Sequence, residues 1–180
     1  MKNYYVKYIV GLFFIFLLSC SQENKKIKDN LSQIIGQKVQ LIDSLRYYSQ
    51  EKGFYKDSIM EQLKIITFID GGCGSCLYDL EKWKEIVALP KLKDIRFLFY
   101  VKCYNRNQLI SVIKEINFTY PIIIDTSNQF YKVNNLKSDK TYQTFLVDKK
   151  NNILLVGNPL YSLQIKSLYL NTLAQFITPK

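Results

Sequence analysis

The sequence contains no histidine in its 180 residues. Histidine is a frequent ligand of zinc and copper, the base of the Ser-His-Asp triad and the last residue of the C-x-x-C-H haem attachment motif. Its absence excludes a serine hydrolase of that type and His-based zinc or copper sites. Covalent haem attachment is also excluded, because Leu77 follows Cys76 where the haem motif needs histidine. Two cysteines alone make a poor zinc site, so we expect no metal and no other cofactor.

Four other residue types are sparse. The chain has four cysteines, four prolines, seven glycines and one tryptophan, and no internal repeat is visible. With 48% hydrophobic and 22% charged residues, the composition is typical of one globular domain with appendages. We therefore expect a single folded domain.

An apolar run near the N-terminus is too short to span a bilayer comfortably. It covers residues 9–18, follows Lys2 and Lys7, and leads into Leu17-Leu18-Ser19-Cys20. Leu-Leu-Ser-Cys resembles the bacterial lipobox, whose cysteine becomes the lipidated first residue after cleavage. We expect residues 1–19 to be a lipoprotein signal peptide and Cys20 to carry the lipid, with palmitate as an acyl chain. An ordinary secretory signal that contains a cysteine is the alternative.

The charge balance is basic. The chain has 25 Lys and Arg against 15 Asp and Glu, and loss of Lys2 and Lys7 with the leader leaves 25 − 2 = 23 basic residues and a net charge of +8. Such a balance can indicate nucleic-acid binding. However, the lysines are spread along the chain, and an exported protein rarely meets DNA. We expect no nucleic-acid partner, and instead a solvated surface or contact with an anionic membrane or an acidic partner.

Two cysteines separated by two residues follow a strand-like run. The run Lys64–Asp70 leads into Gly71 and Gly72, then Cys73 and Cys76, then a helical pattern, which predicts a strand, a turn and a helix N-terminus. A thiol in the first helical turn faces free N–H groups, which favours the thiolate and lowers its pKa. Cys73 is placed for that role, and Cys76 is near enough to form a disulfide with it. A structural disulfide or two idle thiols are the alternatives.

The rest of the chain alternates between strand-like and helical segments. Strand, helix, strand, helix in succession predicts a parallel βαβ arrangement, with a hairpin later in the chain. Cys103 follows a strongly apolar strand, so we expect a packed, inert thiol. The predicted strands are 39–41, 63–69, 95–101, 121–125, 144–147 and 153–156; the helices are 30–36, 75–89, 108–116, 126–133 and 160–177; the loops are a tether at 21–28, a polar loop at 50–58 and a hairpin turn at 148–152.

This order resembles thioredoxin-like redoxins, and it is most similar to the envelope-anchored TlpA/ResA type related to the alkyl hydroperoxide reductase and thiol-specific antioxidant superfamily. The resemblance implies an α/β thioredoxin-like fold, with a central mixed β-sheet flanked by helices behind a signal and lipid anchor. We divide the chain into a signal peptide (1–19), a tether and short helix (20–35) and a thioredoxin-like domain (36–180). The segments that carry the resemblance are Ile65-Ile66-Thr67-Phe68, Cys73-Gly74-Ser75-Cys76, Tyr120–Asp125, Thr144–Asp148 and Gly157-Asn158-Pro159.

The resemblance implies a role for each cysteine. Cys73 would be the exposed nucleophile that attacks a partner disulfide, and Cys76 the resolving thiol that cleaves the mixed disulfide. Asp79 occupies the position at which many TlpA/ResA proteins carry an acidic residue that helps proton transfer; a solvated first-turn carboxylate is the alternative. The implied protein is a thiol–disulfide oxidoreductase, anchored as a lipoprotein in the cell envelope on the periplasmic or outer face. Its partners would be exported protein thiols and disulfides and an envelope redox protein.

The chain departs from the family pattern at three places. Gly72 replaces the tryptophan that usually precedes the first cysteine, and Glu81 replaces a helix proline. The family's cis-proline has no counterpart in Tyr142-Gln143-Thr144-Phe145. A peroxidase is excluded on separate grounds, because Asp70 stands where it would carry threonine. These departures favour a specialised member, and they keep open a second interpretation: a non-catalytic thioredoxin-fold lipoprotein that acts as a binding module in an envelope assembly.

Overall fold

The computed structural model describes residues 29, 31–50 and 63–177. The predicted signal peptide, Cys20 and the tether lie outside these residues, as does nearly all of the predicted loop at 50–58. The chain divides into two compact units, residues 1–35 and Gly36–Lys180. In the first unit, residues 31–34 are helical, and the Ile35 N–H donates to the Leu31 carbonyl at 3.0 Å. In the described part of the chain, no helix combines the length and apolar character needed to cross a membrane.

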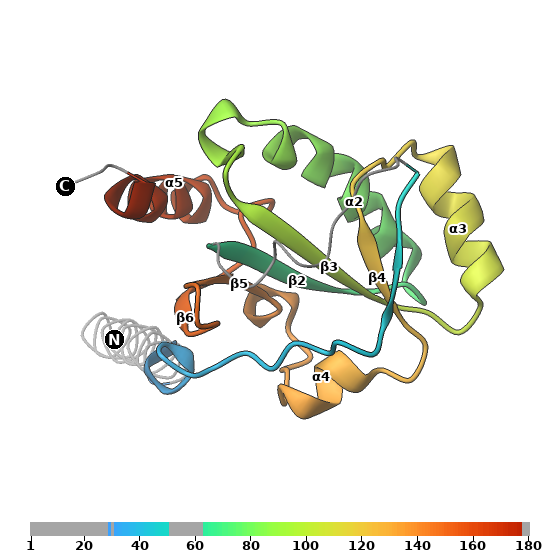
Figure 1. The fold of residues 1–180 in the computed structure, drawn as a ribbon, viewed down its shortest axis with the longest axis horizontal. Coiled ribbons are helices and arrows are strands. Elements are labelled where there is room, and N and C mark those ends of the chain that lie inside the picture. Colours follow the sequence, from blue (N-terminus) through green and yellow to red (C-terminus); the bar gives the residue numbers. More distant parts are fainter. Residues whose placement is uncertain (1–28, 30, 51–62, 178–180) are drawn as a thin grey trace, which may run out of the picture. The chain divides into compact units, whose positions relative to one another are not determined.

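The second unit is built on a six-stranded mixed sheet in the order β1-β4-β3-β2-β5-β6 (Figure 1). Strands β4, β3 and β2 run parallel to one another, as the βαβ pattern predicts. Strand β1 runs antiparallel to β4, β5 runs antiparallel to β2, and β6 runs antiparallel to β5. The predicted mixed sheet is therefore confirmed. The strands are β1 Arg46–Tyr48, β2 Lys64–Asp70, β3 Arg96–Lys102, β4 Ile122–Asp125, β5 Thr144–Val147 and β6 Ile153–Val156.

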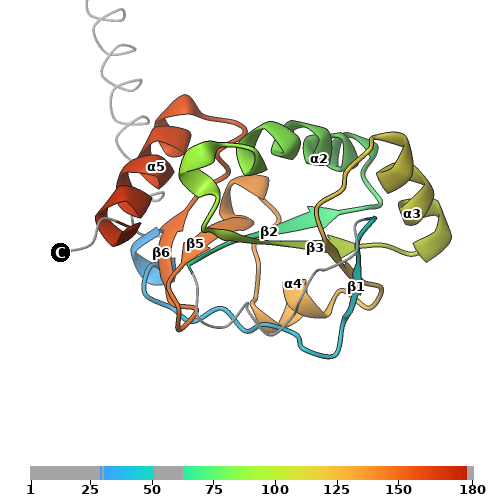
Figure 2. The same ribbon diagram turned by 45° about the horizontal axis from the view of Figure 1, so that its top comes forward.

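Helices cover both faces of this sheet. Figure 2 shows α2 (Gly74–Val87), α3 (Arg106–Glu115) and α5 (Leu163–Ile177) on one face and α4 (Gln129–Val133) on the other. Side chains of β3 alternate between the two layers. Phe97 and Phe99 point to the first face, where Trp83 of α2 meets both rings edge-on. Tyr100 points to the second face and stacks on Phe130 of α4, with ring centroids 3.7 Å apart.

Helix boundaries follow local capping groups. Asn105 accepts hydrogen bonds from the Asn107 and Gln108 N–H groups and starts α3 two residues before the predicted position. Helix α4 starts three residues later than predicted, because Asn128 has a φ of 57° and the Asp125 carboxylate accepts from the Gln129 and Phe130 N–H groups. Helix α5 also starts three residues later than predicted. Helix α2 stops before Pro90, as expected.

The predicted edge strand at residues 39–41 is wrong. Only an isolated bridge joins Lys38 to Asn152, next to the start of β6. The edge strand that this part of the chain forms is β1, which pairs with β4 at the opposite edge of the sheet. Strand β1 has three residues and a charged first position, so its local pattern carries little strand signal. Its pairing with β4, more than 70 residues away, decides the conformation. By contrast, the hairpin β5–β6 forms as predicted, closed by the turn at 148–152.

Candidate active site

A tight turn after β2 brings the chain to the first cysteine. The Gly71 N–H donates to the Lys102 carbonyl at 2.8 Å, and a Cβ at Gly71 would lie 2.4 Å from that oxygen. Only glycine permits this close approach. The Asp70 carboxylate accepts from the Gly72 N–H and forms an ion pair with Lys102 at 3.1 Å. These contacts fix the exit of the chain from the sheet.

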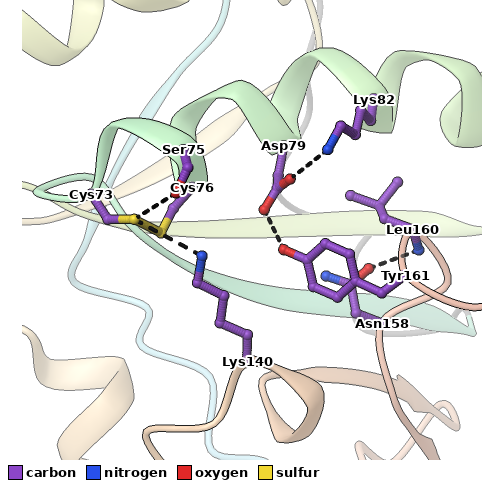
Figure 3. A network of polar contacts seen from close by, with 9 residues as sticks. All are labelled: Cys73, Ser75, Cys76, Asp79, Lys82, Lys140, Asn158, Leu160 and Tyr161. Carbon is purple, nitrogen blue, oxygen red and sulfur yellow. Dashed lines mark hydrogen bonds and ion pairs between the residues drawn. A yellow bond between two sulfur atoms is a disulfide. The ribbon is translucent and has the colours of Figure 1, made fainter.

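Cys73 and Cys76 form a disulfide at the N-terminus of α2, with their Cα atoms 5.2 Å apart (Figure 3). Cys73 is the N-cap residue, and its carbonyl accepts from the Cys76 and Leu77 N–H groups. Its side chain is half-buried, whereas Cys76 is 5% exposed. The predicted strand, turn and helix start are confirmed, and the geometry offers only the first sulfur to an incoming molecule.

Two polar side chains contact the Cys73 sulfur. The Ser75 hydroxyl lies 3.2 Å from Sγ, and the Lys140 ammonium donates to the same sulfur at 3.9 Å. Ser75 belongs to α2, but Lys140 belongs to the 3-10 helix Lys140–Tyr142 that precedes β5 (Figure 3). A cation at this distance favours a thiolate electrostatically once the disulfide is reduced.

Asp79 lies in the second turn of α2 and is 8% exposed. The Tyr161 hydroxyl donates a hydrogen bond to one carboxylate oxygen, and Lys82 forms an ion pair with the other at 3.3 Å (Figure 3). The solvated first-turn carboxylate considered from the sequence is therefore wrong for Asp79. Burial and then the contact with Asp79 raise the pKa of Tyr161, so its hydroxyl remains a donor at neutral pH.

The disulfide, Asp79 and Lys140 border one cavity of about 400 Å³. It reaches from the Asp70–Lys102 ion pair on one side to Tyr161 on the other. In the described residues, no group of three or more Cys, Asp and Glu side chains is placed to hold a metal ion. The other residues that line the cavity are Thr67, Phe68, Ile69, Trp83, Asn128, Tyr131, Ser138, Gln143 and Asn158.

The segment before β5 is built without a cis peptide. All peptide bonds in the described ranges are trans, and the Gln143 carbonyl accepts from the Phe68 N–H at 2.9 Å. The Gln143 side chain donates to the Lys137 and Ser138 carbonyls at 2.8 and 3.3 Å. Gln143 thus holds this segment in place through its backbone carbonyl and its side-chain amide. Gly72 takes the place of the family's tryptophan. A Cβ added at Gly72 would lie 3.5 Å from the ring of the exposed Tyr104.

Cys103 is the one unpaired thiol in the described part of the chain, and it is 4% exposed. Burial, and then the nearby Asp125, raise its pKa. A protonated, buried thiol reacts slowly, which agrees with the prediction of a packed, inert residue.

Sequence reasoning missed Lys140 and Tyr161. Both follow from tertiary contacts, since Lys140 is 67 residues from Cys73 and Tyr161 is 82 residues from Asp79. No local pattern distinguishes Lys140 from the other lysines of the chain. Tyr161 comes shortly after the predicted Gly157-Asn158-Pro159 segment, but nothing in that segment indicates a partner on α2.

Comparisons with known proteins identify the fold. No protein-family model and no curated protein matches the sequence. Among solved structures, a candidate thiol:disulfide interchange protein DsbE from Chlorobium tepidum has a TM-score of 0.60 and 15% identity over 77% of this chain and 97% of its own. The predicted thioredoxin-like fold is therefore confirmed, and this similar structure is described as a thiol:disulfide interchange protein.

Two further solved structures share this fold at low sequence identity. A secreted disulfide oxidoreductase from Mycobacterium tuberculosis, described as homologous to E. coli DsbE, has a TM-score of 0.51 and 13% identity over 66% of this chain and 87% of its own. The exposed lipoprotein thioredoxin Etrx1 from Streptococcus pneumoniae has a TM-score of 0.50 and 16% identity over 64% of this chain and 88% of its own.

Proposed function

We propose that this protein is a thiol–disulfide oxidoreductase that exchanges disulfides with exported proteins through Cys73 and Cys76. The observation that carries the proposal is the asymmetry of the pair: a half-buried sulfur at a helix N-terminus beside an ammonium group, and a second sulfur buried behind it. This is the arrangement that a nucleophile and a resolving thiol require.

The exchange conserves electrons and sulfur bonds. In the reducing direction, the Cys73 thiolate attacks one sulfur of a partner disulfide, the partner bond breaks and one partner thiolate leaves. The Cys76 thiolate then attacks the Cys73 sulfur, releases the second partner thiolate and restores the Cys73–Cys76 disulfide. The two partner thiolates take up protons. Asp79, in the wall of the same cavity, is proposed to accept the Cys76 proton, directly or through water.

We further propose that the protein is a lipoprotein of the cell envelope, anchored through Cys20. The lipobox-like motif supports this, and the pneumococcal protein of the same fold is an exposed lipoprotein. Mass spectrometry of the protein from a bacterial host tests it. Processing at Cys20 with an added lipid mass is expected, and Cys20→Ala should remove both. A mature chain that starts elsewhere without added lipid would contradict the anchor.

A redox titration tests the central proposal. The full chain carrying Cys103→Ala is equilibrated in detergent with glutathione or dithiothreitol buffers, and Cys73 and Cys76 are followed by alkylation and peptide mass. A reversible two-electron transition between roughly −120 and −270 mV, the range from DsbA to thioredoxin, is expected. The position of the midpoint then gives the direction of electron flow.

A binding module with a structural disulfide is the second candidate. It is favoured by the lack of a cis-proline at residues 142–145 and by Gly72 before the first cysteine. In the same titration, this candidate predicts a disulfide that resists strong reductant or a pair of thiols that never closes. Either result would reject the exchange mechanism.

A further inference from the structure

Among the described residues that line the cavity, Lys140 is the one charged side chain without an ion-pair partner. The other charged side chains in the cavity wall have partners: Asp70 pairs with Lys102, and Asp79 pairs with Lys82 and accepts from Tyr161. In the described ranges, no carboxylate forms an ion pair with Lys140, whose side-chain contact is the Cys73 sulfur. The Cys73 sulfur balances this cation only as a thiolate; once it has attacked a disulfide, in the mixed disulfide, and again in the closed Cys73–Cys76 disulfide, it carries no charge.

Lys140 is held in this place by its own loop. Asp139 caps the 3-10 helix by accepting from the Thr141 N–H at 2.9 Å, so this neighbouring carboxylate faces the backbone. The Gln143 amide ties down the carbonyls of Lys137 and Ser138. The ammonium of Lys137 lies 5.4 Å from the ring centroid of Tyr142. A loop with these contacts presents the Lys140 cation at a fixed point beside the reacting sulfur.

A disulfide that approaches Cys73 must therefore bring its flanking groups within a few ångströms of this cation. Asn128, Ser138 and Gln143 add polar groups to the same wall. An anionic group on the incoming molecule gains an ion pair with Lys140, whereas a cationic group is repelled. The positive net charge, +10 for the full chain and +8 without residues 1–19, acts in the same direction at longer range.

We propose that the site selects disulfides that carry a carboxylate next to the disulfide bond, and that Lys140 is the residue that determines this preference. The proposal rests on the exchange activity proposed above and deepens it by naming a substrate class. The chemistry is unchanged: two electrons pass from the Cys73–Cys76 dithiol to the substrate disulfide, with one sulfur bond broken and one formed at each attack.

Three small disulfides of different charge test the proposal. The full chain is reduced with dithiothreitol, freed of reductant and mixed in single turnover with oxidised glutathione (anionic), hydroxyethyl disulfide (neutral) or cystamine (cationic). Each rate is divided by the rate with the neutral disulfide. A change in the pKa of Cys73 alters all three rates by the same factor, so it cancels in these ratios. Recognition of the substrate's charge alters the rates unequally, so it changes the ratios.

The variants are Lys140→Gln, Lys140→Arg and, as a matched control, Lys150→Gln in the hairpin turn at the opposite end of β5. Loss of the cation in Lys140→Gln should lower the glutathione ratio about fivefold and raise the cystamine ratio, since a charge pair at 4 Å in water is worth about that factor. Lys140→Arg and Lys150→Gln should keep the wild-type ratios. Raising the salt concentration to 0.5 M should shift the wild-type rate ratios toward those of Lys140→Gln.

The outcomes separate the two proposals. Equal ratios in the wild type and Lys140→Gln, with exchange still present, would overturn the substrate preference and leave the oxidoreductase intact. A fall of the glutathione ratio in Lys150→Gln as large as in Lys140→Gln would also overturn it, because the net charge of the protein would then cause the preference. No reaction of the reduced wild type with any of the three disulfides would overturn the exchange activity itself.

Discussion

The Tyr161 hydroxyl donates a hydrogen bond to the buried Asp79 carboxylate in the wall of the cavity that contains the Cys73–Cys76 disulfide. This contact joins the segment before α5 to the second turn of α2. It gives the carboxylate a neutral donor on one oxygen, while Lys82 pairs with the other. The orientation of Asp79 in the cavity thus depends on a residue far away in the sequence.

A double-mutant cycle measures this contact. Tyr161→Phe removes the donor and keeps the ring, and Asp79→Asn removes the charge. Because a hydrogen bond to a charged group is worth about 1.5–3 kcal/mol and Tyr161 is partly exposed, we expect a coupling of about 1–2 kcal/mol in the free energy of unfolding. Urea denaturation of the four proteins gives the value. Additive effects of the two substitutions would show that the contact contributes nothing to stability.

Asp79→Asn also tests the proposed proton transfer. If the carboxylate accepts the Cys76 proton, the variant should form the mixed disulfide at the wild-type rate but resolve it at least about tenfold more slowly, since general bases typically contribute 10²–10⁴-fold. Quenching with acid and mass spectrometry would detect the accumulated adduct. Lys82→Gln is the matched control, because it removes the other partner of Asp79 and leaves the carboxylate in place. If Asp79→Asn resolves the mixed disulfide at the wild-type rate, Asp79 does not accept the Cys76 proton and its role is structural only.

Alanine substitutions at Gly71, two residues before Cys73, and at Gly74, directly after it, should change the stability in opposite directions. Alanine at Gly71 would bring a Cβ to 2.4 Å from the Lys102 carbonyl, so the turn must shift; we expect a loss of about 2–3 kcal/mol in the free energy of unfolding. Gly74 is the first residue of α2, and a Cβ there would meet open space. Gly74→Ala should stabilise by about 0.5–1 kcal/mol. Thermal unfolding compares the two, and equal effects would contradict the close approach at Gly71.

The hairpin turn should weaken in acid. Burial acts to raise the pKa of Asp148, but hydrogen bonds from the Asn152 side chain and from the Asn152 and Lys150 N–H groups outweigh it, and the net shift is downward. A carboxyl group whose pKa is lowered by folding stabilises the fold at pH values above its ordinary pKa near 4. This added stability is lost as the pH falls through the pKa of the folded state. Asp148→Ala should cost about 1–2 kcal/mol at pH 7. The difference from wild type should shrink toward pH 2, and a constant difference would contradict this account.

Two buried tyrosines should make the fold sensitive to alkali. Burial raises the pKa of both Tyr100 and Tyr169, whose exposed fractions are 1% and 2%. The unfolded chain releases these protons near pH 10 while the folded chain retains them, so stability falls as the pH rises above 10. Each tyrosine contributes a slope of about 1.4 kcal/mol per pH unit. Urea midpoints at pH 9 and 11 measure the fall, which should be smaller in Tyr169→Phe; an equal fall in both proteins would exclude Tyr169 as a source.

The part of the site that contains the two cysteines could be predicted, because the elements that form it follow one another directly in the sequence. The strand β2, the glycine turn and the start of α2 are contiguous in sequence, and hydrophobic periodicity and glycine placement indicate each of them. The cysteines sit within one helical turn, so their proximity follows from helix geometry. The βαβ order and the β5–β6 hairpin could be predicted for the same reason, since short connections join neighbouring elements.

The sequence by itself determined the central strands, the main helices and the placement of Cys73 and Cys76 at a helix N-terminus, because periodicity and capping act over a few residues. Only the tertiary structure decided that β1 closes the sheet, that Asp79 is buried against Tyr161, and that Lys140 lies beside the Cys73 sulfur. These pairs are separated by more than 60 residues in sequence. The pairing of β5 with β2 brings Lys140 to Cys73, whereas β1 meets β4 at the other edge of the sheet. Strand order depends on the packing of the whole sheet, which no local pattern encodes.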